Sequence, residues 1–197
     1  SSKIFVIQEI DTIFPGLLNS NYKKSKILAN YFNKVIVSQD KIFGRQNISI
    51  KNNGLYIAIK KGDLNYCSLS QISEFLNSDI YIVFGSSFIK GDLIKFLIKK
   101  KAINIHMGIS PYYRGSDCNF WALFDNNPHL VGSTIHLLST GLDNGDLLYH
   151  AMSKIKDNPF NYTMSTVKSA FHSIYEKIKN RSIFDLVPIN QDKNKEI

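Results

Sequence analysis

Two polar side chains, Asn104 and His106, stand in an apolar stretch just before a turn. Side chains two residues apart on a β-strand project from the same face, so Asn104 and His106 are expected to face one space, while Ile105 faces the opposite side. An asparagine amide is a fixed hydrogen-bond donor suited to a developing oxyanion, and a histidine, with an ordinary pKa of about 6.5, exchanges protons near neutral pH. This spacing therefore indicates a site that stabilises negative charge and transfers a proton.

A second polar segment, residues 140–146, follows the next expected strand. Its aspartate, Asp143, can orient a histidine or accept a proton where the fold brings it close to one. Between the two segments, Pro111 and Gly115 shape a loop that can close over the site. Beside Gly145, however, Asp143 is also typical of a turn, and an asparagine and a histidine at a strand end often only satisfy loop backbone groups. The residues by themselves leave both interpretations open.

The surrounding pattern alternates strands with helices. Strands are expected at residues 3–8, 34–38, 55–60, 79–84, 103–106, 132–138 and 147–150, and helices at residues 22–32, 68–77, 91–101, 118–124 and 161–180. This alternation predicts an α/β fold with a Rossmann-like, mostly parallel sheet and helices on both faces. Ligands bind such sheets beyond the carboxyl ends of the strands. Residues 85–88 and 106–115 both lie at strand ends, so we expect them to line one crevice.

The length of 197 residues fits one domain spanning residues 1–197. Within it, Thr163 is expected to cap the last helix, and Trp121 is expected to point inward as a core residue rather than to serve as a stacking platform. The polar residues 190–197 after the last helix are expected to form a frayed tail.

The composition excludes several classes of protein. No apolar run is long enough to span a membrane, and the chain begins with a strand-like segment rather than a signal peptide. The two cysteines, Cys67 and Cys118, make no disulfide framework, and no set of His, Cys and Asp residues has the spacing of metal ligands. We therefore expect a cytoplasmic protein that binds neither a membrane nor a metal.

The formal net charge is +8, and lysines cluster at residues 23–26 and 99–101. We interpret these clusters as solvated helix surface, although a positive field also attracts anionic substrates such as a nucleotide diphosphate or a tRNA. Basic residues do not alternate with exposed aromatic residues in the manner of a nucleic-acid site. The first strand is followed at residues 9–16 by no G-x-G-x-x-G turn, so a dinucleotide cofactor is not expected.

Four pieces of the sequence resemble the folate-dependent formyltransferase family, which includes glycinamide ribonucleotide transformylase, methionyl-tRNA formyltransferase and the sugar N-formyltransferases. The pieces are Asn104 with His106; Pro111, Tyr113, Arg114 and Gly115; Thr134, Ile135 and His136; and Leu142, Asp143, Gly145 and Asp146. Their order and spacing fit the family pattern over roughly residues 80–150, and a looser similarity covers the rest. Asn-x-His alone would mean little, but the pieces together are a specific signal.

The resemblance implies formyl transfer from 10-formyltetrahydrofolate to an amine, without a metal or a covalent intermediate. It implies that Asn104 positions the formyl group and its oxyanion. It gives His106 the part of electrophilic stabiliser and proton-transfer group, and Asp143 that of base or orienter. His136 is interpreted as a structural histidine at the edge of the site.

By the same resemblance, the folate pteridine would lie between the loops at residues 84–89 and 142–146. The cofactor-binding candidates are Phe84, Gly85, Ser86, Phe88, Ile89, Leu142 and Asp146, and the substrate-binding candidates are Tyr113, Arg114 and Trp121. Arg114 can bind an acceptor phosphate or cap its loop. Residues 86–89 and 108–110 depart from the family's usual segments, which leaves the folate contacts open but not the three catalytic positions.

The favoured acceptor is a nucleotide-linked amino sugar, such as a dTDP-4-amino-4,6-dideoxyhexose, for bacterial O-antigen or other lipopolysaccharide. Three features support this acceptor. The chain lacks the glycine-rich phosphate turn of the purine-pathway members of the family, and a tRNA-binding extension is not expected. In addition, four aromatic residues could contact a sugar or base. These residues are Tyr112, Tyr113, Phe120 and Trp121. The alternatives are a methionyl-tRNA formyltransferase catalytic domain, the one case with a nucleic-acid partner, and a non-catalytic folate- or nucleotide-binding module. A homodimer is kept open.

Overall fold

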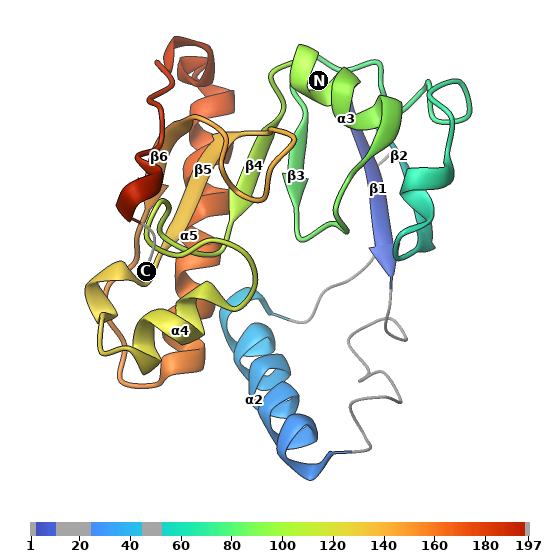
Figure 1. Ribbon diagram of the computed structural model, residues 1–197. Coiled ribbons are helices and arrows are strands. Elements are labelled where there is room, and N and C mark those ends of the chain that lie inside the picture. The colour runs from blue at the N-terminus through green and yellow to red at the C-terminus, as the bar shows by residue number, and fades with distance from the viewer. Residues whose placement is uncertain (1–2, 11–24, 45–52, 196–197) are drawn as a thin grey trace. The chain divides into compact units, whose positions relative to one another are not determined.

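The computed structural model describes residues 3–10, 25–44 and 53–195 (Figure 1). These residues form two compact units. The first unit contains Ser1–Ile80 and Ser86–Phe96, and the second contains Tyr81–Gly85 and Leu97–Ile197. The segment after the first strand, residues 11–16, and the lysines at positions 23 and 24 lie outside the described residues.

The first unit contains a two-stranded parallel sheet. Its strands β1 (Ile4–Ile10) and β2 (Gly54–Lys60) pair in register from one end to the other. Both are rich in β-branched and aromatic residues, as half-buried strands usually are. The short 3-10 helix η1 (Asp63–Tyr66) follows β2. The two strands expected at residues 3–8 and 55–60 are therefore confirmed, with β1 ending two residues later than predicted.

Helix α2 (Lys26–Phe43) corrects the prediction of a helix ending at residue 32 and a strand at 34–38. The Ser25 hydroxyl caps its start by accepting a hydrogen bond from the backbone N–H of Leu28, and Gly44 ends it with a φ of 77°. No glycine or proline lies between these caps. The β-branched residues in between disfavour a helix by only a few tenths of a kcal/mol each, roughly. The strand prediction was therefore wrong because two caps outweigh a short β-type run.

The helix predicted at residues 68–77 is also wrong, since the structure has a series of turns there. The Ser68 hydroxyl contacts the side chains of Ser70 and Gln71, and the Gln71 side chain accepts a hydrogen bond from the Ser68 backbone N–H at 2.8 Å. Serine side chains that bond locally in this way compete with helical hydrogen bonds. The serine-rich segment at residues 68–77 therefore forms turns rather than a helix.

The second unit is built on a four-stranded sheet of order β3-β4-β5-β6. Strand β3 (Ile82–Phe84) is parallel to β4 (Ile103–His106), and helix α3 (Gly91–Lys99) connects them. Strands β5 (Ser133–Leu137) and β6 (Leu147–Ala151) then add antiparallel to β4, and the return of β6 is the hairpin-like one expected. The predicted α/β, Rossmann-like class is confirmed.

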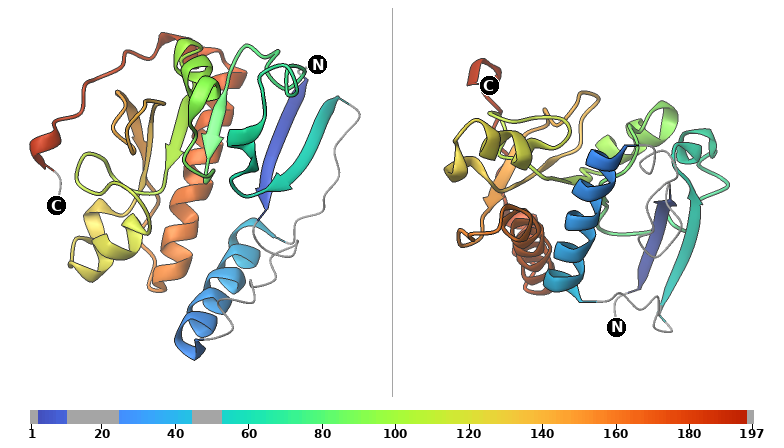
Figure 2. Two further views of the ribbon diagram at one scale, coloured as in Figure 1. Left: turned by 45° about the vertical axis from the view of Figure 1, so that its right-hand side comes forward. Right: turned by 90° about the horizontal axis from the view of Figure 1, so that it is seen from below.

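Helix α5 (Pro159–Lys179) runs along one face of this sheet and packs against β5 and β6 (Figure 2). It begins earlier than expected, because the Asn158 side chain accepts a hydrogen bond from the N–H of Asn161 and Pro159 occupies the first turn. Proline is favoured there since its ring presets the helical φ. The prediction that Thr163 is the cap was wrong. In the described part of the chain, no helix combines the length and apolarity needed to cross a membrane.

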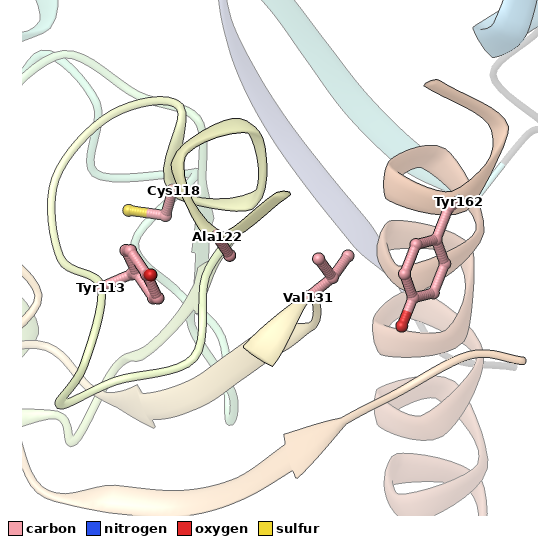
Figure 3. Packing of buried hydrophobic residues seen from close by; sticks show 5 residues of the cluster. All are labelled: Tyr113, Cys118, Ala122, Val131 and Tyr162. Carbon is pink, nitrogen blue, oxygen red and sulfur yellow. The ribbon is translucent and has the colours of Figure 1, made fainter. Parts of the chain in front are cut away.

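Helix α4 (Cys118–Phe124) matches its predicted bounds, and it packs into a small apolar cluster. The buried members are Tyr113, Cys118, Ala122, Val131 and Tyr162 (Figure 3). The small residues Cys118 and Ala122 form the inner face of α4 and let the helix pack closely against the cluster. Trp121 lies about a third of a turn from Ala122, so its side chain points outward and is 48% exposed. The expectation that Trp121 is a core residue was wrong. The 3-10 helices η2 (Pro128–Leu130), η3 (Ser182–Asp185) and η4 (Lys193–Lys195) complete this unit.

Candidate active site

Strands β4 and β5 bring four polar side chains together, among them the catalytic candidates Asn104 and His106. Their antiparallel register places Asn104 opposite His136 and His106 opposite Thr134. Cross-strand neighbours on one face of a sheet touch, so each polar group on β4 has a polar partner on β5. His106 and His136 are almost completely buried, at 5% and 1% exposure. Both histidines therefore depend on protein partners rather than on water.

Asp143 joins this group from the loop after β5. Its Oδ1 accepts a hydrogen bond from Asn104 Nδ2 at 3.0 Å, and its Oδ2 accepts one from the Gly115 N–H at 3.1 Å. Oδ2 also lies 3.2 Å from His106 Nδ1. The carboxylate thus contacts both polar residues of β4 and the loop that follows β4. The structure brings Asn104, His106 and Asp143 into one cluster.

Both ring nitrogens of His106 face oxygen atoms. Nε2 donates to the Tyr113 carbonyl at 3.0 Å, and Nδ1 faces the Asp143 carboxylate. At 3.2 Å the carboxylate is close enough to favour a proton on the His106 ring. Burial lowers the pKa of His106, although the Asp143 carboxylate opposes this shift. Burial would raise the pKa of Asp143, but its interactions with His136 and His106 outweigh burial and lower that pKa.

Asn104 uses its amide group to connect Asp143 with His136. His136 Nδ1 donates to the Leu137 carbonyl at 2.8 Å, and its Nε2 lies 3.6 Å from Asp143 Oδ1. Asn104 Nδ2 lies 3.1 Å from this Nε2 and also donates to Asp143. Both amide hydrogens of Asn104 are therefore engaged within the cluster. His136 has the satisfied bonds of a structural histidine, yet it directly contacts two catalytic candidates.

The turn after His106 is held by Thr134. The Thr134 hydroxyl donates to the Gly108 carbonyl at 2.6 Å and accepts a hydrogen bond from the Ser110 N–H at 2.8 Å. A side chain at Gly108 would lie 2.6 Å from His106 Nε2 and collide with Cys118. Only glycine fits this close approach. Burial raises the pKa of Cys118 to about 12, so its thiol is no nucleophile near neutral pH.

Close backbone contact also explains the glycine beside Asp143. A Cβ at Gly145 would overlap the Leu137 carbonyl oxygen. Asp143 itself adopts a φ of +46°, a left-handed conformation that aspartate tolerates better than most residues. Of the cofactor-binding candidates in this loop, Leu142 is exposed, and the Asp146 carboxylate accepts a hydrogen bond from Asn190 at 3.2 Å.

The other folate-binding candidates lie near the end of β3. Phe84 and Gly85 belong to the second unit, whereas Ser86, Phe88 and Ile89 belong to the first. Phe88 is half-exposed and Ile89 is buried. The position of the pteridine between this segment and residues 142–146, and the crevice expected there, therefore stay predictions.

Residues 87–90 are held within the first unit by two side chains from distant parts of the sequence. Glu9 accepts hydrogen bonds from the Ser87 N–H at 2.6 Å and from the Ser87 hydroxyl at 2.7 Å. Asn65 donates to the Phe88 carbonyl at 3.0 Å and accepts from the Lys90 N–H at 2.7 Å. Burial would raise the pKa of Glu9, but the hydrogen bonds from Ser87 outweigh it, so this pKa is lowered. No motif or periodicity in the sequence signals these contacts.

The three substrate-binding candidates have different surroundings. Tyr113 is buried, and its hydroxyl donates to Asp125 at 3.1 Å and accepts from Asn127 at 2.9 Å. Arg114 is half-buried. Trp121 is exposed, and its ring contacts that of Phe120. Substrate contact by these residues stays a prediction, and for Tyr113 it requires an atom other than its engaged hydroxyl.

Sequence reasoning missed one contact of this site. Gln191, in the segment expected to fray, is buried, and its side-chain amide donates to the carbonyls of Asp143 and Gly145. No periodicity or motif signals such a contact, because it joins positions almost fifty residues apart. The contact of His136 with Asn104 had a weak signal, since both residues alternate with apolar residues on neighbouring strands.

Comparison with known proteins identifies the class. A protein-family model described as "Formyl transferase" matches residues 18–181, which is most of the chain. The chain belongs to the formyl transferase family. The predicted resemblance to this family is confirmed.

Sequence relatives include methionyl-tRNA formyltransferases. The one from Caldicellulosiruptor saccharolyticus is 28% identical over 203 residues, covering 94% of this chain and 63% of the relative. That from Clostridium tetani is 35% identical over 83 residues, covering 42% of this chain and 26% of the relative. The chain spans between about a third and two thirds of the length of the first three relatives.

Solved structures share the fold. The formyltransferase PseJ from Anoxybacillus kamchatkensis, in complex with UDP-4,6-dideoxy-4-formamido-L-AltNAc and tetrahydrofolate, is 18% identical with a TM-score of 0.53, covering 98% of this chain and 82% of that one. A 4-N formyltransferase from Francisella tularensis is 16% identical with a TM-score of 0.56, covering 99% and 75%. Glycinamide ribonucleotide transformylase 1 from Symbiobacterium toebii is 18% identical with a TM-score of 0.54, covering 71% and 70%.

Proposed function

We propose that this protein transfers a formyl group from 10-formyltetrahydrofolate to the amino group of a nucleotide-linked amino sugar. The observation that carries the proposal is the contact set of Asp143, whose carboxylate accepts a hydrogen bond from Asn104 and lies 3.2 Å from His106 Nδ1. This set combines an amide donor, an imidazole and a carboxylate. These are the groups that acyl transfer between two nitrogen atoms requires.

The reaction makes three demands on these residues. The acceptor amine attacks the formyl carbon, the carbonyl electron pair moves to oxygen, and the C–N bond to the folate then breaks with its electron pair on the folate nitrogen. Asn104 stabilises the oxyanion as a donor, and His106 does so once one of its ring nitrogens leaves its present oxygen partner. Asp143 takes the proton that the amine loses, and His106 supplies the one that the leaving nitrogen gains. No metal and no covalent enzyme intermediate are needed in this scheme.

The engaged amide of Asn104 adds a condition to this scheme. Because Asp143 and His136 already occupy both of its hydrogens, the formyl oxygen must compete with one of these acceptors. His136 is the weaker competitor, since a ring nitrogen that accepts a hydrogen bond carries no charge, whereas the bond to the Asp143 carboxylate is charge-assisted. We therefore expect the substrate oxygen to take the hydrogen now given to His136.

The sugar acceptor is supported by two observations. The solved structures that cover nearly all of this chain include PseJ, whose structure holds a UDP-linked formamido sugar, and the 4-N formyltransferase from Francisella tularensis. In addition, Phe120, Trp121 and Phe124 form an exposed aromatic group on α4, suited to contact with a sugar or a base. A dTDP-4-amino-4,6-dideoxyhexose for bacterial O-antigen or lipopolysaccharide is the first acceptor to test.

Formylation of initiator methionyl-tRNA is the second candidate function. It is favoured by the sequence relatives, among which a methionyl-tRNA formyltransferase aligns with 94% of this chain. The net charge of +8 suits a nucleic-acid substrate. Tight, salt-sensitive tRNA binding would support this candidate.

The test is formyl transfer from 10-formyltetrahydrofolate to a panel of dTDP- and UDP-linked amino sugars, with initiator methionyl-tRNA alongside. The wild type is compared with His106→Ala and Asp143→Ala, and Asp192→Asn serves as a control on an exposed carboxylate. We expect turnover with one sugar, lost in the two site variants and kept in the control. Turnover with tRNA alone would establish the second candidate, and folate binding without any transfer would indicate a non-catalytic binding module.

A further inference from the structure

The segment that follows α5 returns to the sheet of the second unit. Ile189 pairs with Leu147 of β6 through two backbone hydrogen bonds, of 2.7 and 2.8 Å. This short antiparallel pairing fixes the backbone immediately before Gln191. The side chain of Gln191 thereby reaches the loop that carries Asp143.

Gln191 holds the backbone of that loop at two points. Its Nε2 donates to the Asp143 carbonyl at 3.1 Å and to the Gly145 carbonyl at 2.6 Å. The side chain is almost fully buried, and its Oε1 has no hydrogen-bond partner within the described residues. A buried carbonyl oxygen without a partner is unfavourable. The two donated bonds are therefore the main contribution of a glutamine at this position.

The loop held by Gln191 has an unusual backbone. Asp143 adopts a φ of +46°, and residues stay in such a conformation only when their surroundings fix it. The direction of the carboxylate follows from that conformation, because the backbone sets where Cβ points. On one side the carboxylate contacts Asn104 and His106, and on the other the carbonyl of the same residue is held by Gln191.

We infer that Gln191 is a positioning residue of the active site, which fixes the backbone of residues 143–145 and so aims the Asp143 carboxylate at His106 and Asn104. Because its amide bonds to the backbone carbonyls of Asp143 and Gly145, it acts through Asp143. The kinetic consequence rests on the proposed function. The geometric consequence, a change in the surroundings of His106, does not.

His106 itself reports on this arrangement. The groups that face it are the Asp143 carboxylate, the His136 ring, the Tyr113 carbonyl and the neutral Cys118 thiol near the following turn. Of these, Asp143 alone carries a negative charge that favours the protonated ring. When that carboxylate moves away, the hydrogen bond to the Tyr113 carbonyl is left as the opposition to burial, and the pKa of His106 falls.

The experiment replaces Gln191 with methionine, which keeps the length of the side chain but cannot donate, and with alanine. The control is Asp192→Ala, which alters the exposed neighbour and leaves the contacts of residues 143–145 in place. His106 is titrated by NMR in each variant, with its signal assigned from His106→Gln. Steady-state kinetics and thermal unfolding are measured on the same samples.

In both Gln191 variants we expect a lower pKa of His106, a kcat reduced by about 10²-fold and a KM changed by less than about threefold, because Asp143 is misdirected while substrate contacts remain. The control keeps the wild-type values. A wild-type pKa of His106 and a wild-type kcat in folded Gln191→Met would overturn the inference. If the wild type transfers no formyl group to any acceptor, the proposed function fails, but the titration still decides the part played by Gln191.

Discussion

Two loops in this protein are held by side chains from distant positions, and they differ in burial. Residues 87–90 of the first unit are bound by Glu9 and Asn65, and this loop is partly exposed, with Phe88 at 50% exposure. Residues 143–145 of the second unit are bound by Gln191, and Asp143 lies among buried histidines. The same kind of hydrogen bond therefore serves in two very different environments.

Because the two loops differ in burial, the loss of a hydrogen-bond partner should have a different energetic cost in each. In an exposed loop, water replaces a missing donor or acceptor at little net cost. In the buried cluster, a group left without its partner keeps its full desolvation penalty, and a charge left alone costs more still. Equivalent substitutions in the two loops should therefore have unequal effects on activity and stability.

Matched charge removal is the strongest test of this difference. Asp143→Asn keeps the shape of the side chain and tolerates the left-handed φ, but it removes the carboxylate between Asn104 and His106. We expect kcat/KM for formyl transfer to fall by about 10²- to 10⁴-fold. Glu9→Gln makes the same chemical change on β1, in the side chain that binds the other loop, and should cost less than about tenfold, since this carboxylate is only partly buried. Equal losses of kcat/KM in the two variants would show that burial does not decide the cost of removing the charge.

Glycine substitutions in the two units should differ in their effect on the free energy of unfolding. Gly145→Ala would push a Cβ into the Leu137 carbonyl, and backbone cannot move aside, so we expect a loss of about 3 kcal/mol in the free energy of unfolding. Gly62→Ala in the first unit meets open space and suffers only from its φ of +93°, with an expected loss of about 1 kcal/mol. Urea unfolding monitored by circular dichroism measures both. A smaller loss for Gly145→Ala than for Gly62→Ala would contradict the packing of Gly145 on β5.

Lowering the pH should destabilise the two units one after the other, the second unit first. The lowered pKa of His106 means that the unfolded chain binds this proton more readily, so stability falls as the pH drops below the ordinary value of 6.5. The lowered pKa values of Asp143 and Glu9 have the same sign but act only below their ordinary values of 3.8 and 4.5. Hydrogen exchange measured against pH should therefore show the second unit losing protection first. In His106→Gln the loss that begins near pH 6.5 should vanish, and persistence of that loss would assign it to another group.

The smallest effect is expected at Asn65. Asn65→Ala removes two hydrogen bonds to residues 88 and 90, both at the surface, so unfolding should become easier by about 0.5–1 kcal/mol. If this loop contacts the folate, KM for 10-formyltetrahydrofolate should rise a few-fold with kcat unchanged. Asn77→Ala, which makes the same change at an exposed position outside this loop, is the control. A fall in kcat instead would place the loop closer to the chemistry than its exposure indicates.

Local sequence patterns determined much of this protein. Strand β4 and helix α4 have the bounds predicted for them, because period-two alternation and a short apolar helix are decided within a few residues. The shared face of Asn104 and His106 follows from the same period. The family signal, spread over four pieces in order, was likewise readable from the chain alone and agrees with the match at residues 18–181.

Secondary-structure predictions from local sequence were wrong where helix-favouring and helix-disfavouring residues nearly balanced. The β-branched residues at 35–37 favoured a strand, yet the caps Ser25 and Gly44 make one helix of the whole stretch. Residues 68–77 had helical spacing, yet serine side chains bond to their own neighbours there. In both cases single-residue preferences differ by less than the energy of one or two capping or turn contacts.

Only the tertiary structure decided how the site is assembled. The register of β4 against β5 pairs Asn104 with His136, and the contact of Gly145 with Leu137 sets where Asp143 enters the cluster. The bonds from Gln191 then hold that loop from a segment nearly fifty residues away. Such contacts depend on strand register and on how closely two backbones approach, and both are fixed by the packing of whole elements rather than by any residue's own preference.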